Sequence, residues 1–210
     1  MRLVLASNNA KKLLELQALL SALPVQLVSQ SALGITEADE PHGTFVENAL
    51  AKARHAAASS GGPSIADDSG LCVDALGGEP GVASAHYADA VAVGDTDREQ
   101  RRTRQDAANT ARLLQRLHGV VDRRARFVST LVALRHAADP EPLIALGRWQ
   151  LEVLHEPHGS GGFGYDPVVH VPTHGCSVAQ LPVALKNQIS HRALAARAMC
   201  SLMHEVWRIG

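Results

Sequence analysis

The fold class of this chain is decided by a stretch near its N-terminus, which reads Leu3-Val4-Leu5-Ala6-Ser7-Asn8-Asn9-Ala10-Lys11-Lys12. The apolar first part of this stretch is typical of a short buried strand. Leucines then recur at helical spacing over residues 13–23, and Pro24 ends that pattern. The chain therefore begins with a strand, a polar turn and a helix.

Strands and helices alternate along the rest of the chain, which predicts an α/β fold. Further strands are expected at residues 25–28, 64–66, 127–134, 143–154 and 168–171. Further helices are expected at residues 44–60, 98–118 and from about 190 onward. Thr44 and Glu47 fit a capping box at the start of the first of these helices. The charged stretch Asp89–Gln105 is predicted to be a mobile loop or a junction between lobes.

Length and composition favour a single cytoplasmic domain over residues 1–210, with room for two lobes. A formal net charge of −1 argues against nucleic acid or an anionic membrane surface as the main partner. The three cysteines are scattered and lack metal-type spacing, which favours a reducing compartment. The apolar run at the N-terminus is too short for a signal peptide or a membrane span.

The first candidate site is the polar turn of residues 7–12. Unpaired backbone N–H groups and the dipole of the following helix favour an anion such as phosphate at this position. Ser7 and Asn9 could donate hydrogen bonds, and Lys12 could add a positive charge. Serine and asparagine are also ordinary helix caps, so a purely structural role stays open.

The second candidate site is the acidic end of the expected strand 64–66, where Asp67 and Asp68 are followed by Ser69 and Gly70. Neighbouring side chains of an extended chain point to opposite sides, so one aspartate can face a metal while the other braces the loop. Magnesium binds one or two carboxylates and completes its shell with water and phosphates, and Glu40 supplies a further carboxylate. An Asx-type turn is the structural alternative.

The third candidate site is the glycine-rich stretch 159–167, which carries one of only three phenylalanines in the chain. Glycine lets the backbone approach a ligand closely, and the ring of Phe163 could stack on a base. Asp166 could accept a hydrogen bond from the ligand. A flexible turn with one hydrophobic anchor is the alternative.

The fourth candidate site is the basic stretch 186–192 at the entry to the last helix. Positive charge at a helix N-terminus opposes the dipole, which hints at a functional use. His191 and Arg192 could donate to the 6-oxo group of a purine, where adenine carries an amino group instead. A solvated basic helix start capped by Ser190 is the alternative. The chain contains no P-loop and no G-x-S-x-G motif, so those two chemistries lose support.

Six short motifs follow one another between residue 3 and about residue 200, namely S-x-N-x-x-K, F-x-E-N-A-x-x-K-A, A-D-D-S-G-L, P-G-V-x-S-A, G-G-F-G-Y-D-P and I-S-H-R. In this order they resemble the inosine triphosphate pyrophosphatase family, also called Ham1-like. The resemblance implies a mixed central sheet flanked by helices, two lobes with the active-site cleft between them, and a homodimer.

The resemblance also implies roles for individual residues. Asp68 would bind at least one Mg²⁺ per subunit and accept a proton from the attacking water, and Glu40 would assist the metal. The residues implied to bind substrate are Ser7, Asn8, Asn9, Ala10, Lys11, Lys12, Lys52, Ser69, Phe163, Gly164, Tyr165, Asp166, Lys186, His191 and Arg192.

The function implied is hydrolysis of ITP, dITP and XTP to the monophosphate and pyrophosphate, which keeps deaminated purines out of DNA and RNA. The partner is then a purine nucleoside triphosphate, without nucleic acid or membrane. One alternative is a Maf-like pyrophosphatase for pyrimidine or modified nucleotides. The other is a nucleotide-binding regulator without turnover, against which the set of Lys12, Lys52 and Asp68 argues.

Overall fold

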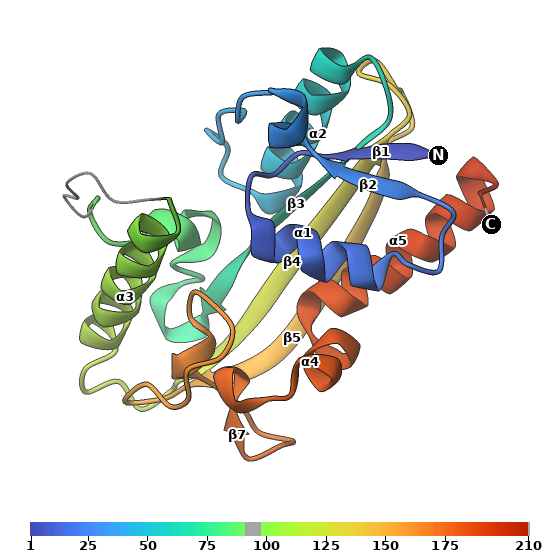
Figure 1. Cartoon of the computed structure of the whole chain (residues 1–210). Coiled ribbons are helices and arrows are strands. Elements are labelled where there is room, and N and C mark those ends of the chain that lie inside the picture. The colour runs from blue at the N-terminus through green and yellow to red at the C-terminus, as the bar shows by residue number, and fades with distance from the viewer. Residues whose placement is uncertain (91–97, 210) are drawn as a thin grey trace. The chain divides into compact units, whose positions relative to one another are not determined.

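The computed structural model describes residues 1–90 and 98–209, and it has the expected α/β architecture (Figure 1). Seven strands form one sheet in the order β2-β1-β3-β4-β5-β6-β7. β1 pairs in parallel with β2 and β3, whereas β6 pairs antiparallel with β5 and β7, so the sheet is mixed. The strands are β1 (Arg2–Leu5), β2 (Gln26–Ser29), β3 (Ser64–Val73), β4 (Arg124–Leu134), β5 (Leu143–Val153), β6 (Val169–Val171) and β7 (Cys176–Ser177).

Five α-helices accompany the strands in the part of the chain that is described. They are α1 (Ala10–Leu19), α2 (Phe45–Ser60), α3 (Arg98–Arg116), α4 (Val183–Ile189) and α5 (His191–Trp207). Short 3-10 helices occur at Gln30–Leu33, Asp74–Leu76, Gly81–His86, Asp166–Val168 and Val178–Gln180.

The chain divides into two compact units. Unit 1 comprises Met1–Ser69, Ser129–Arg148 and the chain from Asn187 onward, and unit 2 comprises Gly70–Val128 and Trp149–Lys186. Each unit collects segments that are distant in the sequence, so neither could be delimited from a linker in the sequence.

Unit 1 buries both faces of its part of the sheet. Leu3 and Leu5 of β1 belong to an apolar cluster with residues of α1 and α5, and these two helices also contact each other. Val4 and Ala6 belong to a second cluster with the alanines of α2. This division follows from the alternation of side chains along a strand.

Helix α2 lies close against the sheet because its inner face is made of small residues. Ala49, Ala53 and Ala56 are fully buried there. At its start the Thr44 hydroxyl accepts from the Glu47 amide at 3.4 Å, as the capping box predicts. The Glu47 carboxylate reaches back to the Thr44 hydroxyl at 2.6 Å instead of to the backbone amide. Both bonds fix the entry of the helix.

Unit 2 contains helix α3, the strands β6 and β7, and the parts of β3, β4 and β5 that fall within residues 70–128 and 149–186. Leu113 of α3 and Leu117, the residue directly after this helix, are fully buried. The side chains of β5 alternate strictly between buried and exposed, as expected for a strand with one solvated face.

The structure corrects three expectations. β3 continues through Asp67 and Asp68 to Val73, so these residues lie within a strand and not in a turn at its end. Lys186 belongs to the separate helix α4, which ends before Ser190 caps α5. Of the stretch predicted as a mobile loop, residues 98–105 form the start of α3, and residues 91–97 lie outside the described part of the chain.

None of the helices in the described ranges is long and apolar enough to cross a membrane.

Candidate functional site

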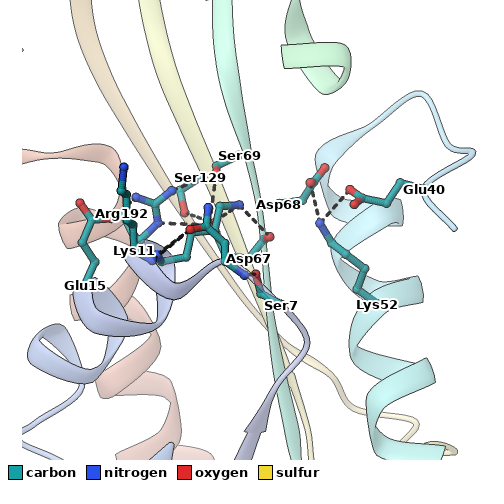
Figure 2. A network of polar contacts seen from close by, with 12 residues as sticks. Ser7, Lys11, Glu15, Glu40, Lys52, Asp67, Asp68, Ser69, Ser129 and Arg192 are labelled. Carbon is teal, nitrogen blue, oxygen red and sulfur yellow. Dashed lines mark hydrogen bonds and ion pairs between the residues drawn. The ribbon is translucent and has the colours of Figure 1, made fainter. Parts of the chain in front are cut away.

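Two adjacent aspartates lie in the interior of unit 1, at the middle of β3. Asp67 and Asp68 have 1% and 6% of their surface exposed. Because successive side chains of a strand point to opposite faces, the two carboxylates meet different partners. Figure 2 shows Asp67 turned toward Arg192 of α5 and Asp68 turned toward Lys52 of α2.

Asp67 is the centre of a buried polar network. Its Oδ2 lies 3.0 Å from Lys12 Nζ and accepts from Arg192 Nε at 3.1 Å. The hydroxyls of Ser129 and Ser69 donate to the same carboxylate at 2.7 and 3.2 Å. Burial alone would raise the pKa of Asp67, but the charges of Lys12 and Arg192 outweigh it and hold this pKa well below its ordinary value. Asp67 therefore stays ionised and acts as an anchor for its neighbours.

The guanidinium of Arg192 joins two carboxylates. Besides Asp67 it contacts Glu15 of α1, whose carboxylate accepts from Nη1, and its Nη2 donates to Ser69 Oγ at 3.0 Å. Arg192 is only 2% exposed. Burial would lower its pKa, but Asp67 and Glu15 outweigh burial and raise it. In this structure Arg192 braces the segment that carries the two aspartates, and its reading of a purine base stays a prediction.

Asp68 has a simpler environment. Lys52 Nζ donates to Asp68 Oδ1 and to Glu40 Oε2, both at 2.8 Å. The other oxygen of Asp68, Oδ2, is buried and has no hydrogen-bond partner among the described residues. Burial raises the pKa of Asp68 to about 6, although the nearby Lys52 charge opposes that rise. A buried carboxylate with a raised pKa and one oxygen unbonded is suited to accept a proton near neutral pH.

The first loop holds its helix by capping. Asn9 Oδ1 accepts from the amides of Lys11 and Lys12 at 3.0 and 3.3 Å, and Ser7 Oγ accepts from the Asn9 amide at 3.1 Å. The backbone amides of Asn9, Lys11 and Lys12, which were expected to be available to a phosphate, are therefore bonded to side chains. A phosphate here would rely chiefly on the Lys12 ammonium, whose pKa is lowered mainly by burial.

The glycine-rich loop of unit 2 is ordered around Asp166. Its Oδ2 accepts from the Phe163 amide at 2.9 Å and from Lys186 Nζ at 2.7 Å. The same ammonium lies 4.9 Å from the centre of the Phe163 ring. Gly162 has φ +75°, and a Cβ there would lie 2.0 Å from Asp166 Oδ2, so glycine is required. The Tyr165 hydroxyl donates to the Ser84 carbonyl at 3.0 Å, which fixes the other side of the loop.

Helix α5 begins where the sequence predicts. Ser190 is its N-cap and accepts from the Ala193 amide at 3.2 Å. His191 follows as the first helical residue and is 5% exposed. Its carbonyl packs against Gly147 of β5, where a Cβ would lie only 1.9 Å away.

The sequence matches the Ham1 family over residues 3–202, which is nearly the whole chain. The chain belongs to the Ham1 family.

Named relatives agree with this membership. A protein of Methylibium petroleiphilum is 67% identical over 207 residues, covering 99% of each chain, and is named dITP/XTP pyrophosphatase. A protein of Leptothrix cholodnii with the same name is 64% identical over 211 residues, covering 100% of each chain. Among solved structures, a HAM1 protein from Coxiella burnetii is 39% identical and superposes with a TM-score of 0.86, over 98% of this chain and 100% of that one. The mixed α/β fold is therefore the fold of Ham1 proteins.

Two residues of the Asp67 network in this Ham1 chain, Glu15 and Ser129, are not among the site residues predicted from the sequence. Glu15 lies one turn beyond Lys12 on α1, and this i, i+3 spacing was a signal for a shared face. Ser129 is a polar residue inside the buried, largely apolar strand β4, and polar residues in such places usually have a bonding partner.

Proposed function

We propose that this chain hydrolyses the triphosphates of deaminated purines, namely ITP, dITP and XTP, to the monophosphate and pyrophosphate, and so keeps them out of DNA and RNA. The observation that carries this proposal is the pair of Asp68 and Lys52, a buried base beside a buried cation, in a chain 67% identical to a protein named dITP/XTP pyrophosphatase. Family membership supports the same activity.

Asp68 is the proposed catalytic residue. Its Oδ2 accepts a proton from water, and the water oxygen attacks the α-phosphorus. The bond from that phosphorus to the bridging oxygen breaks, and pyrophosphate leaves with the electron pair. Lys12 and Lys52 offset the negative charge that builds up on the phosphate oxygens. Both ammonium groups are held in place by carboxylates, so their positions are set before substrate arrives.

Magnesium is the proposed cofactor, with at least one ion per subunit held by Asp68 and Glu40. The described residues hold no group of three or more histidine, cysteine, aspartate or glutamate side chains fit for a metal. Two carboxylates sharing Lys52 still fit Mg²⁺, which keeps several waters and uses substrate phosphates as ligands. When bound, the ion supplies positive charge to the phosphate oxygens.

The remaining candidate residues are proposed to bind the substrate. In unit 1, Ser69 and the loop residues Ser7, Asn8, Asn9, Ala10 and Lys11 would contact the phosphates together with Lys12, and His191 and Arg192 would donate to the 6-oxo group of the base. In unit 2, Phe163 would stack on the base, with Gly164, Tyr165, Asp166 and Lys186 forming its surroundings.

We further propose a cytoplasmic homodimer. The Ham1-like motifs support the dimer, and the cysteines Cys72, Cys176 and Cys200, which are free thiols, fit a reducing compartment.

A panel of nucleotides tests the proposed function. Pyrophosphate release is measured from ITP, XTP, GTP, dATP and dTTP, once with Mg²⁺ and once with EDTA. We expect the highest kcat/KM for ITP and XTP and no release in EDTA, and His191→Ala should narrow the preference for ITP over dATP. A preference for dTTP would favour a Maf-like enzyme, and binding without release would favour a regulator.

A further inference from the structure

The glycine-rich loop is held from outside by a residue of α3. The Gly164 amide donates to Asp106 Oδ2 at 2.9 Å, across 58 positions of the sequence. The preceding amide, that of Phe163, donates to Asp166 Oδ2 at 2.9 Å. Two consecutive amides of the loop thus end on two different carboxylates, one inside the loop and one on a helix.

We propose that Asp106 is a positioning residue for binding of the base: it fixes the loop backbone and so holds the Phe163 ring where the base stacks. This inference rests on the proposed function only in taking Phe163 as the surface that meets the base. Asp106 itself need not touch the substrate.

The loop needs an external hold because its backbone is unusually free. Gly162 and Gly164 have φ values of +75° and +62°. Glycine gains these conformations without steric cost, but it also has more conformations to lose when the loop is ordered. A carboxylate that accepts the Gly164 amide selects one of those conformations, and a charged acceptor gives a stronger bond than a neutral one.

The helix that carries Asp106 is itself firmly attached within unit 2. Asn109, one turn further along α3, is 2% exposed. Its Nδ2 donates to the carbonyls of Ser84 and Ala85 at 3.3 and 3.0 Å, and its Oδ1 accepts from the Ala88 amide at 2.8 Å. The segment 84–88 is therefore bonded to the same helix. Because the Tyr165 hydroxyl also ends on the Ser84 carbonyl, loop, segment and helix form one hydrogen-bonded assembly.

The bond to Asp106 lies one residue away from the ring. Phe163 is also contacted by Lys186, whose ammonium lies 4.9 Å from the ring centre. Removing the Asp106 carboxylate takes away the acceptor of the Gly164 amide, while Lys186 and Asp166 still hold the neighbouring residue Phe163. Such a change should weaken binding of the base and leave binding of a base-free phosphate chain unchanged.

Two ligands separate these effects. Dissociation constants are measured by calorimetry for inosine monophosphate, which has a base, and for inorganic tripolyphosphate, which has none. For Asp106→Ala we expect the dissociation constant of inosine monophosphate to rise roughly tenfold, because one charge-assisted hydrogen bond is lost. The tripolyphosphate constant should stay within about twofold. In turnover, the variant should show a higher KM for ITP at unchanged kcat.

Two further variants serve as controls. Asp106→Asn keeps an acceptor for the Gly164 amide and should restore most of the binding of inosine monophosphate. Asp122→Ala removes an aspartate of the same unit that pairs with Arg124 and, within the described residues, forms no hydrogen bond with the loop; this variant should bind both ligands normally. If Asp106→Ala does not fold, the comparison of Asp106→Asn with Asp106→Glu, which moves the acceptor by one methylene, takes its place.

Equal weakening of both ligands, or unchanged binding of inosine monophosphate in Asp106→Ala, would overturn the proposal. Failure of the proposed function is distinguishable, because the wild type would then bind inosine monophosphate without releasing pyrophosphate from ITP.

Discussion

Asp67 and Asp68 are neighbours on β3, yet their pKa values move in opposite directions. Burial raises both, but only Asp67 has two cations and two hydroxyl groups bonded to it, and these outweigh burial. Asp68 pairs with Lys52, and this lysine also pairs with Glu40. One carboxylate is therefore fixed as an anion, while the other keeps the capacity to take up a proton.

Asp68→Asn tests this division at the residue scale. Because an amide cannot accept the proton, we expect turnover of ITP to fall on the order of 10³-fold, within the usual contribution of a general base. The variant should lose less stability than Asp67→Asn does, because Lys52 keeps Glu40 as a second carboxylate partner. Asp67→Asn is the matched comparison and should cost about 3 kcal/mol of stability, because it removes the shared partner of Lys12 and Arg192. A near-normal rate in Asp68→Asn would remove Asp68 from the mechanism.

At the scale of elements, the close contact of β5 and α5 depends on one glycine. A Cβ at Gly147 would lie 1.9 Å from the His191 carbonyl and 2.7 Å from the Ala195 amide. Both are backbone atoms of the first turns of α5, which carry His191 and Arg192. The helix start can be so near the strand only because residue 147 has no side chain.

Gly147→Ala should therefore displace the start of α5. We expect a loss of about 2 kcal/mol or more in the free energy of unfolding, as for an overpacked core, together with a lower kcat/KM for ITP. Gly43→Ala is the control, since a Cβ there meets nothing within 4 Å, and it should be neutral in both measurements. Equal stability of the two variants would show that β5 and α5 can move apart at Gly147 at little energetic cost, which would contradict this prediction.

The turn between β4 and β5 is organised by Asp139, which is 1% exposed. It accepts from the backbone and guanidinium of Arg135 and from the Glu141 amide. The hydrogen bonds from Arg135 are the main cause that lowers the pKa of Asp139. A lowered pKa contributes stability that is present above the pKa of the unfolded state, near 4, and is lost as pH falls below it.

Asp139→Asn removes this titration. At pH 7 the variant should be less stable by up to about 1 kcal/mol, because Arg135 is partly exposed and its attraction is screened. The difference from the wild type, measured by denaturant unfolding, should shrink as the pH is lowered from about 4 toward 2. A difference that stays constant over this range would contradict the assigned pairing.

For the whole molecule, the sequence predicted the order of elements far better than the partners within the site. The alternation of strands and helices, the start of α2 at Thr44 and the cap of α5 at Ser190 follow from local periodicity and capping chemistry, and the structure confirms them. Helix α4 was missed because its seven residues are too few to show a helical period. The elements that were predicted correctly depend on contacts within a few residues, and local sequence patterns are enough to find them.

The candidate site could be predicted only as a set of residue types. The contacts of Asp67 with Ser129 and Arg192 span 62 and 125 positions, and no local pattern encodes them. The sequence offered free amides at the start of α1, and the structure bonds them to Ser7 and Asn9. Tertiary packing determines which charged side chains pair with one another. The pairing of Arg192 with Asp67 is one result of that packing.

The central claim for the whole molecule is that water attacks the α-phosphorus of a purine nucleoside triphosphate. Hydrolysis of ITP in ¹⁸O-labelled water, followed by mass spectrometry of the products, tests it most directly. We predict one labelled oxygen in inosine monophosphate, unlabelled pyrophosphate, and no inosine diphosphate. Label in pyrophosphate, or release of inosine diphosphate and inorganic phosphate, would contradict it.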